Sequence, residues 1–194
     1  MWLEQTINNY QARGWQFVSI DNLATLNTQH STLITKKWVC LTFDDGYLDN
    51  FTLAYPILKK YLVPFCLYAT RDFYRGTAHP HWNPEASMMT SNQLVELSHD
   101  PLCTIGCHTC SHPHLSTLPK EQQRRELADN MVDLEQLLGT KVRHLAYPHG
   151  DYNTDTLQIV ADLGFKTAVT TSGRPVRTNA RPLELDRFTL TQPN

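Results

Sequence analysis

The sequence lacks the features that mark membrane-spanning, nucleic-acid-binding and disulfide-rich proteins. None of its apolar runs approaches the roughly 18 residues that would cross a bilayer. Neither sign of charge dominates, because 17 Lys and Arg residues stand against 19 Asp and Glu residues and give a formal net charge of -2. A basic face for nucleic acid is therefore not expected, and a neutral or weakly charged substrate suits the chain better.

A signal peptide and a disulfide framework are missing as well. Residues 1–4 have neither the basic nor the apolar region of a signal peptide, so we expect the chain as given to be cytoplasmic; a truncated N-terminus would fit an extracytoplasmic protein. The cysteines number five, which is odd and favours reduced thiols. They are Cys40, Cys66, Cys103, Cys107 and Cys110. No repeat or linker divides the chain, so we expect one domain over residues 1–194.

The apolar pattern predicts strands that alternate with helices. Short apolar runs indicate strands, and apolar residues at helical spacing indicate helices. The expected strands are 38–43, 63–69, 102–106, 142–147 and 165–170, and the expected helices are 50–62, 90–97, 119–138 and 154–163. This alternation is typical of a parallel sheet, either a barrel or a doubly wound sheet. Residues 71–89 break the rhythm, and we expect a surface insertion near the functional rim there.

Two carboxylates and two imidazoles stand where predicted strands end. Asp44 and Asp45 follow an apolar strand, and His108 and His112 lie four residues apart after a later one. Because the carboxyl ends of parallel strands meet at one rim, we expect these side chains to converge. Two imidazoles and one carboxylate suit a divalent metal, and the other carboxylate is left as a base for hydrolysis. We predict that Asp45, His108 and His112 bind the metal and that Asp44 is the base.

Each motif also has a simpler interpretation. Asp-Asp-Gly is common in turns, and a histidine pair can be two ordinary surface residues. Three cysteines that interleave with the histidines (Cys103, Cys107 and Cys110) suggest structural zinc, but their spacing does not match paired Cys-x-x-Cys. The combination of both motifs favours the His-His-Asp site.

Together these segments resemble the polysaccharide deacetylases, the NodB-homology domain of carbohydrate esterase family 4, over about residues 14–187. Residues 42–46 (TFDDG) resemble the first motif of the family, in which the first Asp is the base and the second binds metal. Residues 108–115 (HTCSHPHL) resemble the second, whose two outer histidines are ligands. Residues 147–150 (YPHG) resemble the third motif, which forms a groove wall and donates an oxyanion-hole N–H. The residues of this motif in the chain are similar to those of the biofilm poly-N-acetylglucosamine deacetylases.

The resemblance implies a fold, a cofactor and a reaction. The fold is α/β, a distorted (β/α) barrel with fewer than eight repeats, and the cofactor is one divalent ion, zinc first, with cobalt or nickel as alternatives. The reaction removes N-acetyl groups from N-acetylated sugars, so the partner is a carbohydrate. Asp44 and His149 are the expected catalytic residues, and Tyr147, Pro148 and Trp82 are the expected substrate contacts. The alternatives are an amidohydrolase acting on a small non-sugar amide and a catalytically weak glycan-binding domain.

The chain departs from the family pattern in three places. Ala146 stands where many relatives carry an arginine that tunes the base, so another group is expected to orient Asp44. His149 replaces the usual aromatic residue, and the family's general-acid histidine has no clear match. Either another histidine takes that role, with His149 as our choice, or the chain is shortened, or its activity is low. Residues 183–187 (LELDR) resemble the late segment that supports the site. The pattern does not define an oligomeric state.

Overall fold

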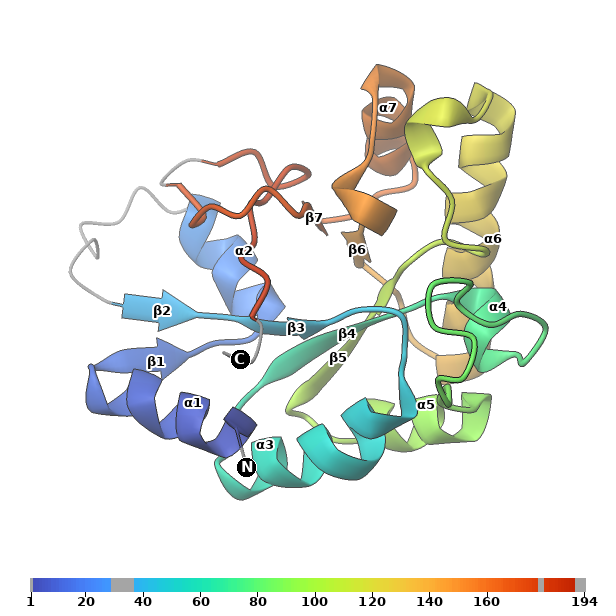
Figure 1. The fold of residues 1–194 in the computed structure, drawn as a ribbon. Coiled ribbons are helices and arrows are strands. Elements are labelled where there is room, and N and C mark those ends of the chain that lie inside the picture. Colours follow the sequence, from blue (N-terminus) through green and yellow to red (C-terminus); the bar gives the residue numbers. More distant parts are fainter. Residues whose placement is uncertain (1, 29–36, 178–179, 191–194) are drawn as a thin grey trace.

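Five short strands form one parallel sheet, and their order across the sheet is their order in the sequence (Figure 1). The structure is a computed structural model that describes residues 2–28, 37–177 and 180–190. The strands are β3 (Leu41–Phe43), β4 (Phe65–Ala69), β5 (Cys103–Cys107), β6 (His144–Ala146) and β7 (Thr167–Val169). Because each strand is added beside its predecessor with the same crossover sense, the connecting helices lie on one face and the sheet curls into a half-barrel. This confirms the predicted distorted (β/α) barrel with fewer than eight repeats.

Helices pack against the outer face of this sheet. They are α3 (Tyr55–Lys60), preceded by a π-helical turn (Asn50–Ala54), α4 (Arg71–Tyr74), α5 (Ser91–Ser98), α6 (Lys120–Leu138) and α7 (Thr154–Asp162), with 3-10 turns at Leu115–Thr117 and Pro148–Gly150. Side chains alternate along a strand, so Phe65 and Leu67 of β4 join the core under the helices, whereas Cys66 and Tyr68 face the barrel interior. In the part of the chain that the structure describes, no helix is both long and apolar enough to span a membrane.

The first part of the chain forms elements for which the sequence pattern made no prediction. They are α1 (Trp2–Ala12), β1 (Trp15–Phe17) and α2 (Ile20–Thr28), and β1 pairs in parallel with β2 (Lys37–Val39). Ile20, at the start of α2, packs with Cys66 and Tyr68 inside the barrel. The strand predicted over residues 38–43 is divided at Cys40 into β2 and β3.

Most of the later predicted elements are confirmed within a few residues. Thr90 caps α5 in a capping box with Gln93, and Gly139 ends α6 in the left-handed conformation at φ 66°. Residues 71–89 are irregular as expected, except for the single turn of α4. The helix predicted over 50–62 is confirmed in position, but its first turn is π-helical.

The C-terminal segment continues the sheet beyond β7. Leu185 forms a parallel bridge with Val169, and the backbone N–H of Ala168 donates to the carbonyl of Pro182. Two residues later, Arg187 reaches the side chain of Thr42 at the end of β3. The segment therefore connects the two edges of the half-barrel on the side where β3 and β7 do not pair.

The barrel interior is tight where Gly106 lies on β5. A Cβ atom at this position would lie 2.4 Å from a ring carbon of Tyr68 and 3.0 Å from the carbonyl oxygen of His144. We therefore expect Gly106→Ala to lower the free energy of unfolding by about 1–3 kcal/mol, measured by urea denaturation. Because the clash is mainly with the Tyr68 ring, the same change should cost less in a Tyr68→Leu background; equal costs in both backgrounds would contradict this account.

Candidate active site

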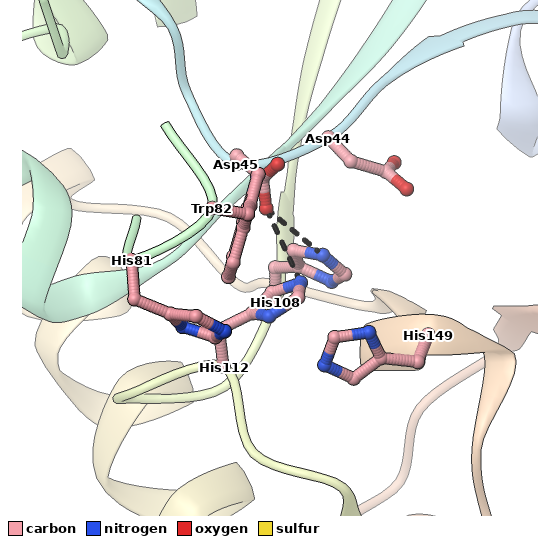
Figure 2. A pocket seen from close by; sticks show the side chains of 7 residues that line it. All are labelled: Asp44, Asp45, His81, Trp82, His108, His112 and His149. Carbon is pink, nitrogen blue, oxygen red and sulfur yellow. Dashed lines mark ion pairs between the residues drawn. The ribbon is translucent and has the colours of Figure 1, made fainter. Parts of the chain in front are cut away.

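The two carboxylates and three of the histidines singled out in the sequence meet at the carboxyl ends of the strands, around one open cavity of about 370 Å³ (Figure 2). Asp44 and Asp45 follow β3, His108 and His112 follow β5, and His149 follows β6. The lining residues are Asp44, Asp45, His81, Trp82, His108, His112 and His149. The expected convergence of the strand-end motifs is thus confirmed.

One carboxylate and two imidazoles form a compact triad in this cavity. Oδ1 of Asp45 lies 3.4 Å from Nε2 of His108 and 3.4 Å from Nε2 of His112 (Figure 2). Ligand atoms of the three residues lie within 4.8 Å of one another, and the described residues offer no other such group of three His, Cys, Asp or Glu side chains. None of Cys103, Cys107 and Cys110 belongs to such a group among the described residues, so the structural-zinc alternative gains no support.

The donor set fits a divalent cation. Oδ1 of Asp45 is buried and, among the described residues, has no hydrogen-bond partner although it faces both histidines. Nδ1 of His108 lies 2.8 Å from the carbonyl oxygen of Ala146, so it carries the proton and leaves Nε2 free to bind a metal. Two imidazole nitrogens and a carboxylate oxygen are a common zinc-type set with an open position.

The two histidines differ in their affinity for protons. Burial opposes the charge on His108, but the close contact with the Asp45 carboxylate and the negative charges of Asp44 and Asp45 outweigh burial and raise the pKa of His108. Burial and the neighbouring His108 lower the pKa of His112 to about 3, so His112 is neutral at physiological pH. A cation at this site would compete with the proton on His108.

Asp44 is held by an arginine from the far end of the chain. Nη1 and Nη2 of Arg187 donate to Oδ1 and Oδ2 of Asp44, each at 2.7 Å. Arg187 also donates to the carbonyl of Thr170 at 2.9 Å and to the hydroxyl of Thr42 at 3.0 Å. Burial alone would raise the pKa of Asp44, but the charge and hydrogen bonds of Arg187 lower it. Arg187 is therefore the group that orients the Asp44 carboxylate.

The insertion at residues 71–89 supplies a wall of the cavity. The Trp82 ring lies 4.5 Å from the His112 ring, and its indole N–H donates to the hydroxyl of Tyr47 at 2.9 Å. Trp82 keeps 43% of its surface exposed. His81 packs edge-on against Trp82 with ring centroids 4.8 Å apart, and it lines the cavity as well.

The third motif contributes one side chain to the cavity rather than three. The His149 ring lies 4.5 Å from the ring of His112 and stacks on the ring of His114 at 3.9 Å. Tyr147 and Pro148, which were expected to contact substrate, are buried and do not line the cavity. The Tyr147 hydroxyl instead donates to the carbonyl of Leu183 at 2.9 Å, so this residue anchors the C-terminal segment.

Known proteins share both sequence and fold with this chain. The Bacillus subtilis (strain 168) protein YxkH, named for a polysaccharide deacetylase, is 32% identical over 137 residues, which are 71% of this chain and 46% of YxkH. A poly-β-1,6-N-acetyl-D-glucosamine N-deacetylase of Staphylococcus aureus (strain MRSA252) is 24% identical over 161 residues, 79% of this chain and 54% of its own. The chain thus spans about half the length of these curated relatives.

A solved structure gives the same fold. The Streptococcus pyogenes deacetylase PplD, in complex with acetate, matches with a TM-score of 0.84 and 29% identity, over 96% of this chain and 78% of PplD. The polysaccharide deacetylase family model matches residues 34–168, a range that contains all three strand-end motifs. The resemblance seen in the sequence is confirmed: the chain belongs to the polysaccharide deacetylase family.

Proposed function

We propose that this chain is a metal-dependent hydrolase that removes N-acetyl groups from an N-acetylated polysaccharide, with residues 1–194 as one catalytic domain. The observation that carries the proposal is the Asp45, His108 and His112 triad beside a second carboxylate held by Arg187. Family membership supports it, as do a relative named for N-deacetylation of poly-N-acetylglucosamine and the acetate held by PplD.

Asp45, His108 and His112 would hold the ion, which we propose to be zinc. When bound, such an ion supplies Lewis-acid polarisation of an amide carbonyl and makes a water molecule more acidic. The buried position of both histidines limits competing contacts of their rings with bulk water.

Asp44 is the proposed base. Its lowered pKa keeps it ionised at neutral pH, so it can accept the proton of the attacking water. Arg187 occupies one lone pair on each carboxylate oxygen and leaves the others available. Arg187 thereby fixes the carboxylate in one orientation without blocking it.

Two further imidazoles are candidates to protonate the departing amine. His149 and His81 both line the cavity, from the third motif and from the insertion. We propose His149 as the proton donor and its backbone N–H as a donor to the developing oxyanion. The exposed Trp82 ring offers an apolar face on which a sugar can stack.

The first prediction from the proposed function separates the two adjacent carboxylates. Asp44→Asn should lower acetate release from N-acetylglucosamine oligomers by about 10²–10⁴-fold, the usual contribution of a positioned base, and should retain zinc. Asp45→Asn should lose zinc as well, measured by titration of the metal-free protein. Zinc loss in Asp44→Asn alone would reverse the two roles. Stoichiometric zinc without acetate release by the unaltered chain would contradict the sugar substrate and favour another amide.

The second prediction concerns the orientation of Asp44. Arg187→Lys keeps a positive charge but cannot donate two parallel hydrogen bonds, so kcat should fall by about 10–100-fold with little change in zinc affinity. Arg181→Lys is the matched control, because Arg181 lies in the same segment with its side chain 82% exposed. A similar kcat in both variants would argue against a positioning role.

The third prediction tests the proton donor through the leaving group. An amine must be protonated to depart, whereas 4-nitrophenolate departs without a proton. His149→Gln should therefore lose about 10²-fold on the N-acetyl sugar but much less on 4-nitrophenyl acetate. If His81→Gln shows this selective loss and His149→Gln does not, the donor is His81.

A further inference from the structure

Glu126 reaches from helix α6 into the backbone of the loop that joins His108 to His112. One oxygen, Oε2, accepts the N–H groups of Cys110 and Ser111, each at 2.9 Å. The other, Oε1, accepts the Ser111 hydroxyl at 2.8 Å. Two consecutive N–H groups that converge on one oxygen form a concave anion site, so an ionised carboxylate is well suited to it.

The same loop has an unusual backbone. Thr109 and His112 have φ angles of 65° and 60°, in the left-handed region that non-glycine residues, and β-branched threonine above all, seldom adopt. Such conformations persist where the surroundings fix them. Besides Glu126, helix α6 supplies Asn130, whose side-chain amide donates to the carbonyls of Thr109 and, at 2.9 Å, Ala69.

The two metal-ligating imidazoles are supported in different ways. The His108 ring is fixed by the hydrogen bond between its Nδ1 and the carbonyl of Ala146. Nδ1 of His112 is buried and has no hydrogen-bond partner among the described residues. A ligating histidine is ordinarily oriented by such a second bond. The direction of the His112 ring must therefore come from the loop backbone and from the neighbouring rings that pack on it, which include those of Phe73, Trp82 and His149.

We propose that Glu126 is a positioning residue for His112. Its carboxylate fixes the backbone at residues 110 and 111, and this sets the direction in which Nε2 of His112 faces Asp45 and His108. The inference rests on the proposed metal site. It predicts that the loss of Glu126 weakens metal binding through His112 while the barrel stays folded.

The experiment measures zinc and cobalt dissociation constants by chelator competition, with the melting temperature of each metal-free variant. Glu126→Ala should raise the Kd for zinc by about 10–100-fold, the usual effect of losing a group that orients a ligand. Glu126→Gln keeps one acceptor oxygen and should show a smaller rise, as should Ser111→Ala. Glu121→Gln removes the same charge from an exposed position of α6 and should leave the Kd unchanged.

A second measurement asks whether Glu126 acts through His112. In a His112→Ala background, Glu126→Ala should add little further loss of cobalt affinity, because the ligand it positions is already absent. Fully additive losses, or equal Kd values for the Glu126 variants and the unaltered chain, would overturn the inference and leave the proposed function intact. An unaltered chain that binds neither metal would overturn the proposed metal site and this inference together. If Glu126→Ala does not fold, Glu126→Gln and Ser111→Ala carry the test.

Discussion

The ion pair between Arg187 and Asp44 links the last described segment of the chain to the first strand of the half-barrel. The two side chains are only 15% and 29% exposed, so both charges are largely withdrawn from water. Desolvation offsets much of the attraction in such a pair, and a buried ion pair is weak evidence for stability. Its clear effect is geometric, because two parallel hydrogen bonds fix the plane of the carboxylate. The link across the open edge of the half-barrel and the orientation of the proposed base thus both depend on the contact between Arg187 and Asp44.

Two consecutive carboxylates have different surroundings because the backbone turns between them. Asp45 has a φ of 71° and Gly46 a φ of 88°, so the chain turns directly after β3. Asp45 points toward the two histidines, whereas Asp44 points away from them (Figure 2). One carboxylate therefore faces imidazoles and the other a guanidinium. The two side chains are chemically identical, so only their different surroundings make Asp45 a metal ligand and Asp44 a base in the proposed mechanism.

Local patterns predicted most of the sheet and its helices, because apolar periodicity and caps act over a few residues. The convergence of Asp45, His108 and His112 was also predictable, since parallel strands bring their carboxyl ends to one rim whatever their separation in sequence. Long-range partners had no such signal: Arg187 and Asp44 are 143 residues apart, and only resemblance to a family segment pointed to the region of Arg187. Burial of Tyr147 was missed because a motif records which residue is present but not the direction of its side chain.

Backbone strain is concentrated at the rim. Five described non-glycine residues have positive φ angles, and four of them belong to the strand-end motifs; these four are Asp45, Thr109, His112 and His149. Each such residue costs on the order of 1–3 kcal/mol and persists only where its neighbours determine its conformation. The fully buried β4 and the helices packed behind the sheet provide that support. Changes that loosen the packing behind the sheet should therefore also disturb the conformations of the site residues.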